Sequence, residues 1–374
     1  MNRPLLVLNA VLALAFAALW SADRFLERAA ATKRWQASVL RGLGDAALAL
    51  EQVARVELSI RGGEEAWTYE RRPEGWRIPR YRDAFALAQN LEGILKVFID
   101  GRGTRVGRFP EGAAHFGLTP EDTLRVDLHD GRGQRLLGAA AGIVAPGQRS
   151  TECFATADGD ATILQLHANP WPYLDWTPAS TFPPLTDRRV IPLALGRSSI
   201  ARVQIRGTGT GVHTLIRKEI PLERRPMGPD RGPRFEWFGT LANEPADEPT
   251  ERRVNDGAAF AYIAAASGLE FDELLGDRTR HEAAFARPVL TLTFHYDGDA
   301  RDDLVLGAPA PAGRRHLLNA STGQVFAISA ERARSLTPDT TALLRPNPPP
   351  LRTSPQTPAI PGLTPPGLPD ETEE

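Results

Sequence analysis

The densest group of potential metal ligands in this chain lies late in the sequence. It comprises His295, Asp297, Asp299, Asp302 and Asp303. A calcium loop needs oxygen ligands at alternating positions, a central glycine and a distal bidentate glutamate. Here the glycine falls between the first two aspartates, and no suitable glutamate follows. Asp-Gly between two apolar runs is typical of a hairpin, so the pattern favours a turn over a metal site.

A glycine-rich run, Gly207-Thr-Gly209-Thr-Gly211, has the composition of a loop that cradles phosphate. A dinucleotide-binding fingerprint requires a strand, a glycine loop and then a helix whose N-terminus meets the phosphate. A second alternating strand follows these glycines instead. The run therefore predicts a hairpin turn.

No other arrangement of residues predicts catalysis. The seven histidines are dispersed, and no two show the one-turn helical spacing of a zinc ligand pair. The chain has no Gly-x-Ser-x-Gly motif. Cys153 has no nucleophile signature around it, and we expect it to be a small buried side chain. The sequence thus predicts a protein that is not an enzyme and that binds no cofactor or metal.

One aromatic cluster remains as a candidate binding site. Trp171, Tyr173 and Trp176 lie within the sequence Asn-Pro-Trp-Pro-Tyr-Leu-Asp-Trp, near the middle of the chain. Exposed aromatic clusters anchor protein contacts, so these residues could form a partner-binding groove. The alternative is packing between two domains, which the sequence favours. We keep partner binding as the functional hypothesis for these three residues.

Length and composition bound the class of protein. A chain of 374 residues is long enough for two domains of ordinary size. Its content of 42% hydrophobic and 24% charged residues is that of a folded protein. A nucleic-acid-binding protein normally shows a concentrated basic excess, and the formal net charge of −2 argues against this class. The single cysteine excludes an intrachain disulfide.

The elements that would position these residues occur twice. One copy runs from about residue 53 to 176 and the other from about 200 to 344. Each opens with an alternating strand, VARVELSI or SIARVQIR, followed by a second strand, a tryptophan-containing element, an Ala-rich helix and further strands. Asp83 predicts the N-cap of the first helix, over 83–95, and Asp256 stands before the second helix. Short strands joined by hairpins favour antiparallel order.

The predicted fold class is α+β: two tandem related domains of mostly antiparallel sheet with one main helix each, behind an N-terminal transmembrane helix. We expect a membrane anchor over 1–22 and a helical stalk over 23–51. A first domain over 52–176, a Pro-rich linker over 177–199 and a second, diverged repeat over 200–344 follow. Residues 345–374 are Pro-rich and acidic, and we expect them to be disordered.

Residues 5–20 form an apolar run broken only by Asn9. The run is slightly short of the roughly 20 residues that cross a bilayer, and the amphipathic residues after it complete the span. A cleavable signal peptide is the alternative, but cleavage after Ala22 would place bulky Trp20 at the minus-three position. We therefore expect an uncleaved anchor.

Two features of the sequence give opposite predictions for the side of the membrane on which the body of the protein lies. Counted by the positive-inside rule, the basic residues lean toward a cytoplasmic body, because Arg3 alone precedes the apolar run and four basic residues follow it by position 34. A minimal N-terminal segment before one hydrophobic run is instead typical of export signals.

The order of motifs resembles the bacterial DUF4340 family, a domain of unknown function. The matching residues are Gly75-Trp76, the helix after Asp83, Phe116-Gly117-Leu118-Thr119-Pro120, residues 126–128 and Leu137-Gly138. Proteins of this family are typically membrane-anchored and often encoded beside components of gliding-type ABC transporters. The resemblance implies an envelope accessory role, with the body in the periplasm and the anchor in the inner membrane. It implies no catalytic residues.

These observations predict a non-enzymatic envelope protein that acts as an accessory or scaffold of a membrane complex. Its expected partners are the lipid bilayer, through the N-terminal helix, and the subunits of an ABC-type (gliding-like) transporter, with no nucleic acid. The alternative is an extracytoplasmic ligand-binding module for polysaccharide or peptide that uses a groove between the domains. A hydrolase is a distant third hypothesis.

Overall fold

The computed structural model of the protein describes residues 38–39, 48–99, 102–142, 153–174, 180–207, 211–221, 235–241 and 250–346. The predicted anchor, most of the predicted stalk and the predicted tail beyond residue 346 lie outside these ranges. Within them, no helix is both long enough and apolar enough to cross a membrane.

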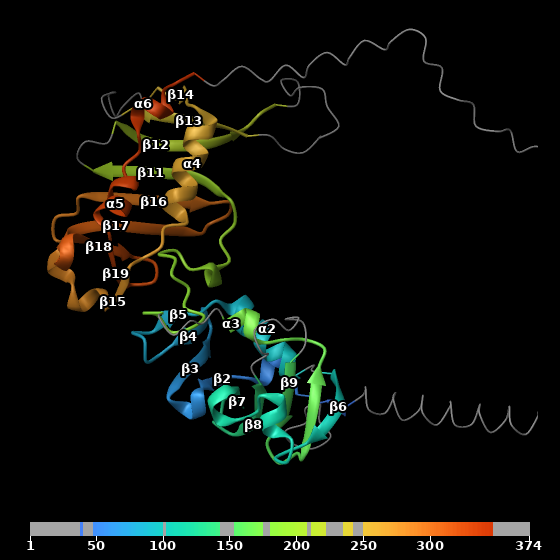
Figure 1. The fold of residues 1–374 in the computed structure, drawn as a ribbon. Coiled ribbons are helices and arrows are strands. Elements are labelled where there is room, and N and C mark those ends of the chain that lie inside the picture. Colours follow the sequence, from blue (N-terminus) through green and yellow to red (C-terminus); the bar gives the residue numbers. More distant parts are fainter. Residues whose placement is uncertain are drawn as a thin grey trace, which may run out of the picture.

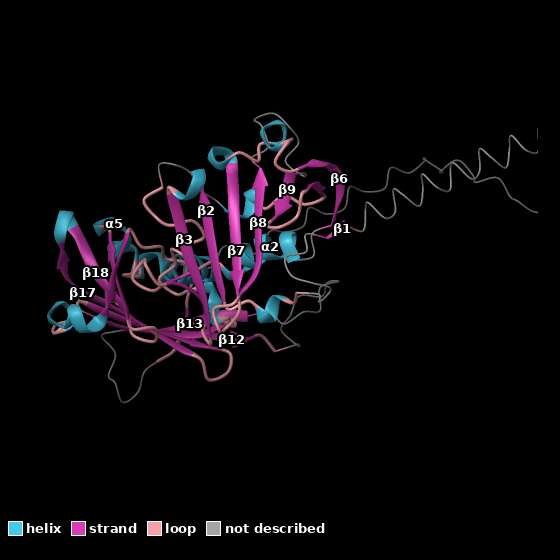
Figure 2. Ribbon diagram, turned by 90° about the horizontal axis from the view of Figure 1, so that it is seen from below, coloured by secondary structure: helices cyan, strands magenta, loops and turns pink. Residues whose placement is uncertain are grey.

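The first sheet is antiparallel throughout and has ten strands in the order β1-β6-β10-β9-β8-β7-β2-β3-β4-β5. Figure 2 shows β3, β2, β7, β8 and β9 side by side. Its strands are β1 (Ser38–Val39), β2 (Arg55–Ile60), β3 (Glu65–Arg72), β4 (Gly75–Ile78), β5 (Ala84–Phe85), β6 (Arg102–Arg108), β7 (Thr123–His129), β8 (Arg135–Gly142), β9 (Cys153–Ala157) and β10 (Thr162–Leu166). One long helix, α2 (Ala88–Ile99), lies between β5 and β6 in the chain, and the short helix α3 (Trp171–Leu174) follows β10.

The second sheet is also antiparallel, with nine strands in the order β14-β13-β12-β11-β16-β17-β18-β19-β15. Its strands are β11 (Ile200–Gly207), β12 (Val212–Glu219), β13 (Phe235–Leu241), β14 (Arg252–Arg253), β15 (Glu273–Asp277), β16 (Leu290–Tyr296), β17 (Arg301–Ala310), β18 (Arg314–Asn319) and β19 (Gln324–Ile328). The long helix α4 (Asp256–Ser267) precedes β15, and α5 (Ala330–Ser335) and α6 (Thr340–Leu343) follow β19.

The two sheets share one topology. Apart from β1, the first sheet reads β6-β10-β9-β8-β7-β2-β3-β4-β5, and the second, read in reverse, is β15-β19-β18-β17-β16-β11-β12-β13-β14. Each strand thus has a counterpart with the same place in the chain and in the sheet. We call the described residues up to 174 the first unit and those from 200 onward the second unit. Figure 1 shows the second unit above the first.

The long helices of the two units also correspond residue by residue. Both have 12 residues, so position 88 of α2 aligns with position 256 of α4. On this alignment four buried positions coincide, because side chains three and four apart share one helix face. The pairs are Leu91 with Ala259, Ile94 with Tyr262, Leu95 with Ile263 and Phe98 with Ala266. The same face of each helix therefore packs against its own sheet.

The prediction that Asp83 caps the first helix is wrong. The helix begins five residues later, at Ala88, and Ala84–Phe85 form strand β5 against β4. Asp83 has a φ of 60° and its neighbour Arg82 a φ of 50°. This left-handed corner turns the chain back onto β4 before the helix starts. In the second unit the helix begins at Asp256 itself, and Asn255 is the N-cap, since its Oδ1 accepts a hydrogen bond from the Ala258 N–H.

Most predicted strands are confirmed, and both predicted hairpins form. Strands β11 and β12 pair on either side of the glycine run, and β16 and β17 pair around Gly298. The predicted strands did not include β6, β9, β15 and β18 or the two-residue strands β1, β5 and β14. β6 is rich in arginine and glycine, β9 was placed in no predicted element, and β18 begins with Arg-Arg-His. The sheet supplies partners to these strands, and their local sequence alone does not predict them.

Residues 180–199, here called the strap, connect the two units and are hydrogen-bonded to both. On the first unit, Asp187 N–H donates to the carbonyl of Phe85 (2.9 Å) and Leu185 accepts from Leu87 N–H (2.7 Å). On the second unit, Val190 N–H donates to the carbonyl of Leu269 (2.8 Å). The strap is also buried at Leu185, Val190 and Ile191. It holds the units together as part of the core.

A second contact joins the units at the left-handed corner. Gln324 Nε2 donates to the carbonyl of Asp83 (3.0 Å), and the Arg82 guanidinium bonds the carbonyl of Leu274. A left-handed residue other than glycine persists only where its surroundings hold it in place. The corner therefore depends on the second unit for its conformation.

The carboxylate of Asp187 organises the strap from within, since the residue is only 3% exposed. Its two oxygens accept hydrogen bonds from the backbone N–H groups of Arg189 (3.1 Å) and Leu193 (2.8 Å). Burial raises the pKa of this carboxyl group, although the two N–H groups oppose the shift.

We predict that Asp187→Ala lowers the free energy of unfolding by about 2 kcal/mol, because two backbone donors lose their acceptor. Urea unfolding of the full chain, followed by tryptophan fluorescence, measures this change. Asp299→Ala removes an exposed carboxylate and is the control, with an expected change within about 0.5 kcal/mol. Equal effects of the two substitutions would contradict the role given to Asp187.

Candidate functional site

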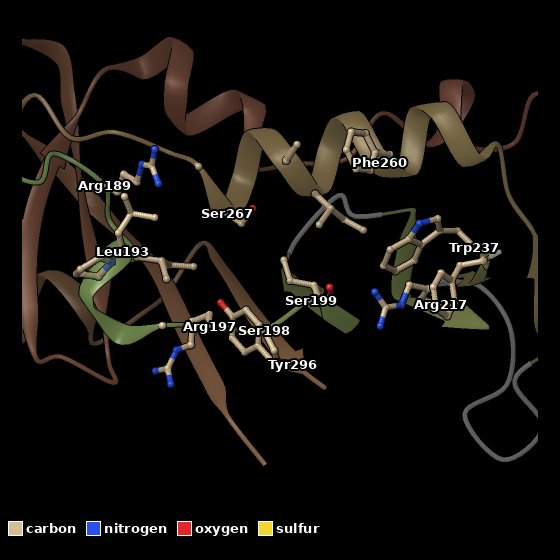
Figure 3. A pocket seen from close by; sticks show the side chains of 18 of the residues that line it. Arg189, Leu193, Arg197, Ser198, Ser199, Arg217, Trp237, Phe260, Ser267 and Tyr296 are labelled. Atoms are coloured by element: carbon tan, nitrogen blue, oxygen red, sulfur yellow. The ribbon is translucent and has the colours of Figure 1, made fainter. Parts of the chain in front are cut away.

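A groove with a volume of about 1040 Å³ lies in the second unit. Helix α4 forms one side of it, and the strap together with strands β11, β12, β13 and β16 forms the other (Figure 3). Four aromatic side chains line the groove: Phe235, Trp237, Phe260 and Tyr296. Such a site, mostly apolar with a few polar groups, is typical of a binding surface.

Two of these rings are unusually exposed. Phe260 on α4 is 69% exposed and Phe235 on β13 is 41% exposed. Along α4 the next outward positions, Ala261, Ala264 and Ala265, are exposed and apolar as well. A helix on the surface of a soluble domain normally turns a polar face to water. The outer face of α4 is therefore suited to a contact that removes it from water.

In the first unit, the equivalent outer face of helix α2 carries charged residues. On the helix alignment, Phe260 corresponds to Glu92 and Ala264 to Lys96. In α2 these positions are charged, and Lys96 points into solvent. The exchange of Glu and Lys for Phe and Ala separates the two repeats at the groove.

The exchange also changes the bonding of a tryptophan. Trp76 pairs with Arg71 across β3 and β4, just as Trp237 pairs with Arg217 across β12 and β13. Trp76 Nε1 donates to Glu92 Oε1 at 3.4 Å. Phe260 stands in the place of that glutamate and has no acceptor. Within the part of the chain that the structure describes, no residue accepts a hydrogen bond from Trp237 Nε1, and this atom is open to water, since it is not one of the buried polar atoms without a partner.

Arg197, at the end of the strap, fixes one wall of the groove. Its Nε and Nη2 donate to the two oxygens of Asp302 at 2.7 and 2.8 Å. Asp302 is fully buried, and the hydrogen bonds to it raise the pKa of Arg197. The Arg197 guanidinium also lies 5.5 Å from the centre of the Tyr296 ring. Burial, followed by the charge of Asp302, raises the pKa of Tyr296.

The predicted turn at Asp297 and Gly298 is confirmed, and its aspartates make ion pairs. Asp297 receives two hydrogen bonds from Arg217 Nη2, at 2.7 and 2.6 Å. The same guanidinium lies 4.4 Å from the centre of the Phe235 ring. Asp303 pairs with Arg301. Among the described residues, no group of three or more His, Cys, Asp or Glu side chains is placed to hold a metal ion.

The predicted aromatic site lies on the first unit. Trp171 Nε1 donates to the carbonyl of Gly142 (3.0 Å), and Tyr173 is 41% exposed. The Tyr173 ring lies against Gly93 of α2, where a Cβ atom would come within 2.7 Å of it. Trp176 lies outside the described residues. The structure therefore places two of the three side chains in or beside α3 on α2, and not in the groove of the second unit.

Cys153 is buried in the first sheet, as its small apolar character predicts. Burial raises the pKa of its thiol to about 12.

A smaller cavity of about 410 Å³ lies where the units meet, lined by Arg77, Arg82, Asp83 and Asp277 among others. Arg77 is 8% exposed and its guanidinium lies 3.3 Å from the centre of the Phe85 ring.

The sequence did not predict the groove because its residues come from five separate segments. One signal was present: aligning the long helices of the two repeats sets Phe260 against Glu92, so that a phenylalanine stands at a position that is charged in the first repeat.

A scan against protein-family models, a search of curated proteins and a search of solved structures each found no match to this chain.

We predict that Arg197→Met lowers the free energy of unfolding by about 3–5 kcal/mol, because it leaves a buried carboxylate without its partner. The double variant Arg197→Met, Asp302→Asn removes that charge and should recover at least half of the loss. Chemical denaturation of the full chain measures both. Arg301→Met breaks an exposed pair with Asp303 and should change stability by less than about 1 kcal/mol. An Arg197→Met variant as stable as Arg301→Met would contradict this account of the groove wall.

Proposed function

We propose that this protein is a non-enzymatic, membrane-anchored envelope protein that acts as an accessory or scaffold of a membrane complex. The groove of the second unit is the docking site for the partner. The observation that carries the proposal is the 69% exposed Phe260 on an apolar helix face beside three further aromatic rings. Aromatic and arginine side chains in such a groove are the residues that dominate the energetics of protein contacts.

The proposed location of the protein in the cell is based on its sequence. In this proposal residues 1–22 anchor the chain in the inner membrane, and the two units stand in the periplasm. The motifs of the first repeat resemble the DUF4340 family, which supports an ABC-type (gliding-like) transporter as the complex. The second unit, which differs from the first at the groove, then supplies the contact with the transporter subunits.

The alternative function is a ligand-binding module for polysaccharide or peptide. Aromatic faces stack on sugar rings as well as on peptide side chains, so the groove also supports this alternative. The two functions differ in what the groove touches in the native membrane: a neighbouring membrane protein or a diffusible ligand.

We predict that a photo-reactive amino acid at position 264, on the groove side of α4, cross-links the full-length protein to transporter subunits in native membranes. The matched control is the same amino acid at position 96, the equivalent outward position of α2. Mass spectrometry identifies the cross-linked chains.

Subunits with the sequence of an ABC-type transporter, captured from position 264 and not from position 96, are the expected result. Equal capture from both positions, or capture of no transporter subunit from position 264, would sink the docking proposal. A polysaccharide or a small peptide attached at position 264 would favour the alternative function.

A further inference from the structure

We propose that the groove of the second unit binds an extended proline-rich segment, and that residues 347–374 of the same chain are its occupant. Three features of the described residues support this: a tryptophan N–H in the groove to which no described residue is bonded, two exposed phenylalanine rings, and the position of the last described residues.

The first feature is a hydrogen-bond donor without an acceptor. Trp237 is 8% exposed as a residue, and no described residue accepts a hydrogen bond from its Nε1. This atom is not one of the described buried polar atoms without a partner, so it is open to water at the groove. In the first unit Glu92 accepts from the equivalent Trp76. A polyproline II segment makes no internal hydrogen bonds, so its carbonyl groups are free to accept. One such carbonyl would replace water at Trp237 Nε1, in the place where Glu92 accepts from Trp76 in the first unit.

The second feature is the arrangement of the rings. Phe235 and Trp237 lie on β13. Figure 3 shows Trp237 and, on the facing helix α4, Phe260. Proline-rich segments dock in aromatic-lined grooves because their rings fit between flat side chains and little conformational entropy is lost. Residues 347–374 contain prolines along most of their length, from Pro348 to Pro369.

The third feature is the tether. Asn255 N–H donates to the carbonyl of Leu343 (2.7 Å), and Asn255 Nδ2 donates to the carbonyl of Pro346 (3.3 Å). Asn255 is the N-cap of α4, one residue before Asp256, which lines the groove. The chain therefore passes residue 346 at one end of the groove.

The length of helix α4 matches that of a short extended segment after Pro346. Helix α4 has 12 residues and is about 18 Å long. A polyproline II segment rises about 3.1 Å per residue, so about six residues after Pro346 span the helix. A binding segment joined so closely to its site has an effective concentration in the millimolar range, and weak contacts are enough to seat it.

In this arrangement the segment competes with any partner for the groove. A docking partner must displace residues 347–374, and the exposed rings stay covered until it does. The proposal concerns the isolated chain, and it stands or falls independently of which partner the groove takes.

The test uses trypsin on the purified full-length protein, because residues 347–374 contain one arginine, Arg352. The rate of release of peptide 353–374 is followed by mass spectrometry. A synthetic peptide of residues 347–374 gives the rate for an undocked segment. We expect release from the native chain to be about tenfold slower than from this peptide, because cleavage follows the population of the undocked form.

Phe260→Glu is the key variant, because it restores the residue type found at the equivalent position of α2. Its carboxylate can accept from Trp237 Nε1, and the substitution removes the exposed phenyl ring against which the prolines would pack. We expect release to rise to the rate of the free peptide. Val289→Glu adds the same charge at a 37% exposed apolar position outside the groove and should release peptide as slowly as the native chain.

Release from the native chain at the rate of the free peptide would overturn the proposal. So would equal rates in the native and Phe260→Glu chains. Protection that weakens on dilution would show that a second copy supplies the segment, which contradicts binding within one chain. The unfolding midpoint of Phe260→Glu is measured alongside. Should it fall, the triple variant Pro348→Ala, Pro349→Ala, Pro350→Ala weakens the segment and leaves the groove intact, and an unchanged release rate in that variant also overturns the proposal.

Discussion

The structure depends on the fixed path of the strap between the two sheets. Residues 180–199 bond to the first unit through Asp187 and Leu185 and to the second through Val190. Ordering backbone costs about 1–2 kcal/mol per residue, and the buried side chains and hydrogen bonds of the strap offset that loss. Because the path is fixed, its last residues reach the second sheet in one position. Arg197 meets the buried Asp302 there and completes the groove wall.

The groove arises from a difference between two units of the same topology. Each unit packs one helix on its sheet through the same four positions. The first unit keeps a charged outer face on that helix, and Glu92 accepts from Trp76. In the second unit Phe260 stands in the place of the glutamate, and no described residue accepts from the indole of Trp237. The two repeats thus share one topology and differ in the polarity of the outer helix face.

The sequence predicted those parts of the fold that are set by local pattern. The alternating strand from Val56 to Ile60 and the Asp297-Gly298 turn carry their own signals, and the structure has both. Strand β6 has no apolar alternation and depends on its neighbours. The sequence predicted a helix cap at Asp83. The left-handed backbone conformation found there is held by a hydrogen bond from the second unit, and the local sequence does not indicate it. The groove was not predicted for the same reason, since Phe235, Phe260 and Arg197 meet only in the folded chain.

Amide hydrogen exchange of the full-length protein tests the central claim most directly, because it reports how firmly the strap is held. We expect peptides covering residues 183–192 to exchange as slowly as those from the central strands β7 and β16. We also expect Asp187→Ala to accelerate exchange in the strap and in the groove wall around Arg197, with β7 unchanged. Exchange of the native strap as fast as that of the exposed turn at Gly131 would show a loose linker and would contradict this account.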